Sequence, residues 1–164
     1  MCSSDLVLDQ HNLEPDLTVA AKSTLGAAEI ATGARKESLS ALADSVEVGE
    51  KAGSALLVAR ARLAYAEALL AAGDAQRARD TAFAVQQWFG SAGNLEAEWR
   101  AWLVVSGAQK ALGDSAKSRE SAQKAAQLLA TLAQKWDSDS YKSYLDRPDI
   151  QDRDRQLAKL AAAR

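Results

Sequence analysis

Apolar residues recur along this chain at the spacing of an α-helix. Between residues 54 and 72, Leu56, Leu63 and Leu70 lie seven positions apart, and alanine or leucine flanks each of them. This spacing places one apolar stripe along a helix. Few segments alternate apolar with polar residues, as a half-buried strand would. The pattern therefore predicts an all-α protein.

The same pattern returns with a 40-residue period. Gly33, Gly73 and Gly113 follow this period, and so do Gly53 and Gly93. Glycine often ends a helix in the left-handed conformation, and the aspartate after Gly73 and Gly113 can cap the helix that follows. A fixed period of about 20 to 50 residues is typical of repeat arrays, in which each unit needs its neighbours to bury its apolar face.

Each 40-residue repeat is expected to be a pair of antiparallel helices. The expected helices span residues 16–32 and 35–51, 54–72 and 75–92, and 95–112 and 115–134. Ala34 stands where a capping aspartate would, so the first turn should be looser. A short helix through residues 138–145 and a final helix over residues 149–163 follow, with Pro148 in the first turn of the latter. The chain thus divides into an N-terminal segment (1–14), a repeat array (15–136) and C-terminal capping helices (137–164).

The residues around the glycine turns resemble a tetratricopeptide repeat. The second and third repeats supply the large, small and turn residues of that family at Tyr65, Ala66, Ala68, Gly73, Asp74, Ala78 and Ala82, and at Trp102, Val105, Ser106, Ala108, Gly113, Asp114, Ala122 and Ala125. The resemblance implies a right-handed α-solenoid of about three repeats. The family repeat is shorter, with about 34 residues. The usual alanine of the family is also replaced here by Ser118.

The tail of residues 144–150 is similar to the ends of many bacterial tetratricopeptide proteins. We therefore expect a C-terminal fragment of such a protein. The opening residues 2–6 match the translation of a common sequencing adapter. We expect residues 1–6 to be an assembly artefact that replaced a longer N-terminus, with a disordered tail as the alternative. Targeting information would be lost with that N-terminus, and the compartment is left open, with the cytoplasm favoured.

Composition excludes several classes of function. There are 20 basic and 22 acidic residues. The chain therefore lacks the excess of basic residues that would indicate nucleic-acid binding. No apolar run approaches the length of about 18 residues that a membrane helix needs. Cys2 and His11 are the only cysteine and histidine, and no glycine-rich phosphate loop occurs. The sequence predicts no catalytic residue, cofactor or metal ligand, and therefore no enzyme.

Two groups of residues have a second interpretation. Acidic residues such as Asp137 and Asp139 are assigned to helix capping and solubility, with cation binding as the alternative. The tryptophans are assigned to the core between helices, with an aromatic binding patch as the alternative; they are Trp88, Trp99, Trp102 and Trp136.

The family resemblance implies that the first helix of each repeat lines a concave groove. The matching positions are Arg60, Leu63, Glu67 and Leu70 in the second repeat, and Arg100, Leu103, Gly107 and Lys110 in the third. The arginines and the lysine would favour an acidic or C-terminal peptide, with ordinary surface charge as the alternative.

These inferences lead to one expected function and two alternatives. The first is a non-catalytic scaffold that binds a protein or peptide partner on a concave surface. The second is the C-terminal regulatory or sensor array of a larger bacterial signalling protein, either a protein kinase or a winged-helix transcriptional regulator, whose N-terminal domain is missing. The third is self-association through an exposed N-terminal edge.

Overall fold

The structure, a computed structural model, describes residues 14–32 and 35–162, and within them every regular element is a helix. The eight helices are α2 (Pro15–Thr32), α3 (Arg35–Lys51), α4 (Ala55–Ala71), α5 (Ala75–Ser91), α6 (Leu95–Ala111), α7 (Ser115–Lys135), α8 (Ser138–Leu145) and α9 (Pro148–Ala161). The prediction of an all-α chain is confirmed for this part. The turn at Ala34, the opening segment, Cys2 and His11 lie outside the described residues.

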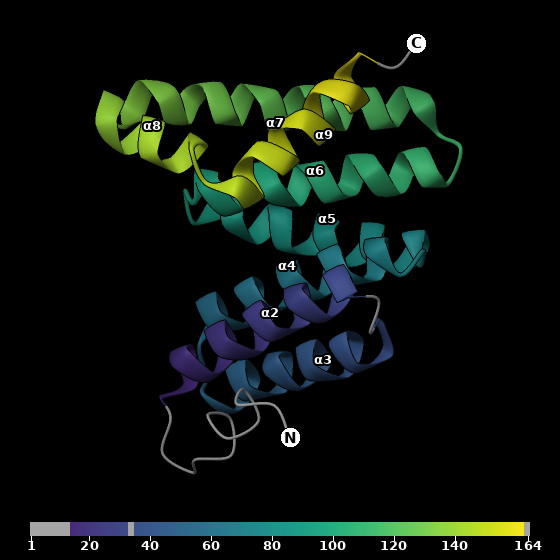
Figure 1. The fold of residues 1–164 in the computed structure, drawn as a ribbon, viewed down its shortest axis with the longest axis vertical. Helices are drawn as coiled ribbons and strands as arrows, with labels where there is room; N and C mark the ends of the chain where they lie inside the picture. Colours follow the sequence, from purple (N-terminus) through teal and green to yellow (C-terminus); the bar gives the residue numbers. More distant parts are fainter. Residues whose placement is uncertain (1–13, 33–34, 163–164) are drawn as a thin grey trace. The chain divides into compact units, whose positions relative to one another are not determined.

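The chain forms two compact units, Met1–Asp74 and Ala75–Arg164. In the first unit, α3 packs against both α2 and α4, and α2 also contacts α4 (Figure 1). Its core includes Val19 from α2 and Leu57 and Ala61 from α4, with Val46 and Val48 of α3 packed against them. Three helices thus share one apolar interior.

In the second unit, α6 packs against α5 and α7, and α9 contacts both α6 and α7. Figure 1 shows α9 crossing in front of these two helices, with α8 beside one end of α7. The largest fully buried side chains of this unit are Phe89 of α5, Trp99 and Val105 of α6, and Ile150 of α9. Because α9 contributes Ile150, the C-terminal segment is part of this core.

The four junctions from α3 to α7 share one recurring turn. Gly53, Gly73, Gly93 and Gly113 all have positive φ, between +66° and +89°. After α6, the Gly113 N–H donates to the Lys110 carbonyl (3.0 Å) and the Asp114 N–H to the Gln109 carbonyl (2.9 Å), and the other three turns contain the same pair of bonds. This pairing is a Schellman motif, which satisfies the last carbonyls of a helix.

These turns are evenly spaced along the chain, because each of α3, α4, α5 and α6 is 17 residues long. At three of these turns the structure shows the residue after the glycine capping the next helix. The side chains of Ser54, Asn94 and Asp114 accept a hydrogen bond from the backbone N–H three residues ahead. The 40-residue repeat in the sequence is therefore two structurally equivalent steps of one helix and one turn.

Gly113→Ala should lower the free energy of unfolding by about 1–2 kcal/mol, because a Cβ disfavours the left-handed conformation. A Cβ at this position would meet no atom within 4 Å, so the cost comes from the backbone alone. Urea denaturation followed by circular dichroism measures it. Gly113→Asn is the matched variant and should lose less, since asparagine tolerates positive φ better. Equal stability of Gly113→Ala and the wild type would contradict the assignment.

Buried serines join the two helices of the α6–α7 hairpin. The Ser106 hydroxyl donates to the Ser118 carbonyl (2.7 Å), and the Ser118 hydroxyl donates to the Ser106 carbonyl (2.9 Å). In the first unit the Ser38 hydroxyl donates to the Gly26 carbonyl (2.8 Å), which is the same bond two periods earlier in the sequence. The Ser118 hydroxyl therefore holds α7 against α6.

Candidate functional site

The four expected contact positions of the second repeat lie on α4, in the first unit. Arg60 is exposed, whereas Glu67 and Leu70 are half-buried. Leu63 is only 3% exposed and belongs to the interior. The surface along this row is therefore formed by Arg60, Glu67 and Leu70, with Leu63 supporting it from below.

The corresponding positions of the third repeat lie on α6, in the second unit. Arg100 is half-buried, Leu103 is 3% exposed, Gly107 is half-buried and Lys110 is exposed. The two rows are related by the 40-residue period, so α4 and α6 present equivalent stripes. Lys110 replaces Leu70, which makes the α6 row more basic at its C-terminal end.

Arg100 is engaged by its neighbours rather than presented to solvent. Its Nη1 lies 3.6 Å from the Glu96 Oε1, one turn earlier on α6. The Tyr144 hydroxyl of α8 donates to the same carboxylate oxygen (3.1 Å) and accepts a hydrogen bond from the Trp99 Nε1 (2.9 Å). Glu96, Trp99, Arg100 and Tyr144 form a partly buried polar group, the Tyr144 cluster. The cluster joins α6 to the C-terminal segment.

The corner between α8 and α9 continues this group. Arg147 makes a two-pronged contact with Asp149, from Nε to Oδ1 (3.0 Å) and from Nη2 to Oδ2 (2.8 Å), and its guanidinium carbon lies 5.6 Å from the Tyr144 ring centroid. Arg153 donates to Asp149 as well (2.9 Å). The Asp149 carboxylate, like that of Glu96, therefore faces arginine side chains.

Burial and charge act in opposite directions on Asp149. Burial by itself would raise the pKa of this carboxyl, but the Arg147 hydrogen bond and the positive charges of Arg147, Arg153 and Arg100 hold the pKa below its usual range. Arg100 of α6 thus lies close enough to α9 to favour the charged form of Asp149. The arginine expected to attract an acidic partner already has an acidic neighbour within the chain.

Sequence reasoning did not find the Tyr144 cluster. Glu96 and Arg100 share one face of α6, one turn apart. This spacing was the only feature of the sequence that could have indicated part of the cluster. The two tyrosine bonds span 45 and 48 residues of sequence. They depend on where α8 packs, and the 40-residue period does not extend to α8.

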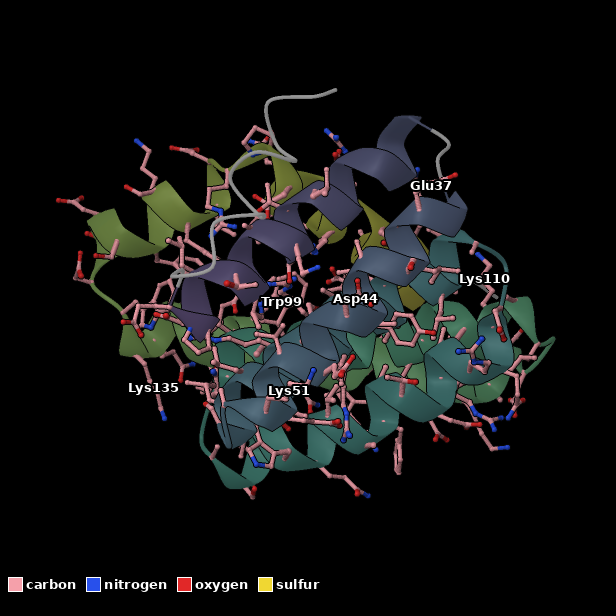
Figure 2. All side chains as sticks on the ribbon, turned by 90° about the horizontal axis from the view of Figure 1, so that it is seen from below. Glu37, Asp44, Lys51, Trp99, Lys110 and Lys135 are labelled. Atoms are coloured by element: carbon pink, nitrogen blue, oxygen red, sulfur yellow. The ribbon has the colours of Figure 1, made fainter. Side chains whose placement is uncertain are left out.

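The assignment of the tryptophans to the core holds for two of the four. Trp99 is completely buried, and Trp102 is 8% exposed, with the Phe83 ring nearly perpendicular to it at 6.0 Å between ring centroids. Trp88 is half-buried against Phe89, and Trp136 is 37% exposed, with its ring edge-on to Tyr144 at 5.3 Å. Figure 2 shows the side chain of Lys135, the residue before Trp136, projecting away from the ribbon.

The described residues contain no group of three or more histidine, cysteine, aspartate or glutamate side chains placed to hold a metal ion. In this part of the chain no helix is both long and apolar enough to cross a membrane. Comparison of the chain with protein-family models, curated proteins and solved structures gave no match.

The Tyr144 cluster predicts a loss of stability at alkaline pH. Burial, followed by the negative charge of Glu96, raises the pKa of Tyr144 well above its ordinary value. A raised pKa means that the folded state keeps its proton longer than the unfolded state. Protonated Tyr144 therefore makes its full contribution to the free energy of unfolding below about pH 10, where an unfolded tyrosine titrates. This contribution is lost as the pH rises further. The free energy of unfolding should fall above about pH 10.

Urea denaturation at several pH values from about 8 to about 11, on both sides of the ordinary tyrosine pKa of about 10, measures this effect. Tyr144→Phe should make the decline in stability at alkaline pH less steep. Any decline that remains in this variant would come from Tyr141, because burial also raises the pKa of Tyr141. Phe83→Leu, a change at an exposed ring of the same unit that leaves both tyrosines in place, is the control and should retain the full decline. A wild-type profile identical to that of Tyr144→Phe would refute the prediction.

Proposed function

We propose that this chain is a tetratricopeptide-like scaffold that binds a segment of another protein along its first helices. The array would form a right-handed solenoid of about three repeats, with α8 and α9 as the cap. The recurrence of one glycine turn after each of four successive helices carries this proposal, because modular arrays are built by stacking identical steps.

Small buried residues at equivalent positions add support. Ala68 and Ala108 on the first helices of the two repeats, and Ala82 and Ala122 on the second helices, are all buried. Two helices approach closely only where small side chains lie at their crossing. Both pairs follow the 40-residue period, so the small residues recur with the repeat.

The rows on α4 and α6 suggest the chemistry of the partner. Arg60 and Lys110 are exposed, and they belong to the same rows as the half-buried Leu70 and Gly107. An extended or helical segment with carboxylates and a few apolar side chains would complement either row. Since Arg100 is paired with Glu96, Arg60 and Lys110 are the basic residues on which this preference rests.

The test uses a short fluorescent peptide of glutamate and leucine with a free C-terminal carboxylate. Binding is followed by fluorescence anisotropy. Arg60→Glu combined with Lys110→Glu should weaken binding about tenfold or more, equivalent to about 1.4 kcal/mol. Arg77→Glu combined with Lys142→Glu makes the same change in net charge elsewhere on exposed surface and should have little effect. Equal loss in both double variants, or no binding by the wild type, would refute the proposal.

A further inference from the structure

The C-terminal helix α9 is attached by one narrow apolar stripe. Ile150, Leu157 and Leu160 are buried, with at most 4% of each exposed. The opposite face is polar and exposed, and consists of Gln151, Asp152, Asp154, Arg155, Gln156 and Lys159. Elements with few buried apolar contacts open at lower free energy than the core of the same unit.

The surface under α9 is built from two helices, α6 and α7. α9 contacts both of them, and Figure 1 shows it crossing them. At its start, Asp149 is held by Arg147 and Arg153 of its own segment. The surface under α9 therefore accepts a row of apolar side chains.

We infer that the α6–α7 face under α9 is a docking site for an amphipathic helix of a partner protein, and that α9 is its exchangeable intramolecular occupant. This inference rests on the proposed scaffold function and names the class of partner. A helix whose apolar face lies in a groove between helices is a common mode of peptide recognition. Here the chain itself supplies a bound example of the ligand.

The pattern of α9 defines the partner. Its three buried residues are spaced by seven and then three positions, which places them on one helical face. The partner helix should therefore carry three apolar residues on one face, the second and third lying seven and ten positions after the first. Its outer face should be polar.

Hydrogen exchange of the intact wild-type chain tests whether α9 opens separately. Amides in the middle of α9 should exchange at least about tenfold faster than those in the middle of α6, since local opening exposes only the outer element. Equal exchange rates in the two helices would mean that α9 unfolds only together with the core of the unit. That result would overturn the inference without any partner being needed.

A labelled peptide of residues 147–162 tests the docking site directly. The full chain carrying Leu157→Ala and Leu160→Ala should bind it at least about tenfold more tightly than the wild type, whose own α9 competes at high effective concentration. Gln151→Ala with Gln156→Ala, on the outer face of α9, is the matched control and should behave as the wild type. A peptide with glutamine at positions 157 and 160 should not bind.

The outcomes separate this inference from the proposed function. Failure of the weakened variant to bind the peptide, with its helical content retained by circular dichroism, overturns the docking site. Binding of the acidic peptide through Arg60 and Lys110 could still be intact, and the scaffold proposal would then stand. A weakened variant that dimerises without binding the peptide would assign the face to a second copy of the chain and also overturn the inference.

Discussion

Trp99→Ala should lower the free energy of unfolding of the second unit by about 3–5 kcal/mol, the usual cost of removing a buried aromatic side chain. Trp99 is completely buried and is the largest side chain in that condition among the described residues. The substitution removes its packing and also the hydrogen bond from Nε1 to the Tyr144 hydroxyl (2.9 Å). Both losses fall on the contact between α6 and the C-terminal segment.

Urea denaturation at neutral pH measures this effect. Two further variants separate the loss of packing from the loss of the hydrogen bond and compare a buried with an exposed aromatic ring. Trp99→Phe keeps most of the apolar volume but removes the hydrogen bond, so it should cost less than Trp99→Ala. Phe83→Ala removes an aromatic ring that is 45% exposed and should also cost less than Trp99→Ala. A Trp99→Ala loss no larger than that of Phe83→Ala would show that Trp99 is not central to this unit.

Ser106→Leu should lower the free energy of unfolding by about 2–4 kcal/mol, because it combines overpacking with the loss of a buried hydrogen bond. At this point α6 and α7 are close enough for the Ser106 hydroxyl to lie 2.7 Å from the Ser118 carbonyl. A leucine side chain has no room there unless the two helices move apart.

The control for this variant is already present in the chain. Ala66 and Ala78 occupy the equivalent positions of the middle repeat, and both are completely buried. The double variant Ser106→Ala and Ser118→Ala reproduces that pair and should cost only about 1–2 kcal/mol, because it removes two hydrogen bonds of about 1 kcal/mol each and adds no bulk. If Ser106→Leu were as stable as the double alanine variant, the helices would not be closely packed at this position.

The helices were predictable because their signals are local. A glycine followed by Asp, Asn or Ser marks each of the four turns from α3 to α7, and the expected helix bounds agree with the structure to within two residues. The equivalence of the two turns in each repeat was not apparent, because only Gly73 and Gly113 are followed by aspartate. Asn94 and Ser54 perform the same capping with different side chains.

The contact rows were less predictable than the helices. Helical periodicity shows which residues share a face, but it does not show what covers that face. Leu63 and Leu103 were expected in a groove and are buried, and Arg100 faces Glu96 and the start of α9. These outcomes depend on contacts with segments distant in sequence. Tyr144, which lies beyond the last repeat, has no counterpart in an earlier repeat to indicate its role.

The recurring glycine turn has a consequence for how such a gene can change in length. Gly73-Asp74 and Gly113-Asp114 end and begin helices with the same backbone geometry and the same pair of terminal bonds. A duplication or deletion whose two breakpoints fall in these turns leaves every helix intact and every junction capped. Recombination can therefore add or remove whole hairpins without creating a new junction, and engineered versions can be lengthened at the same points.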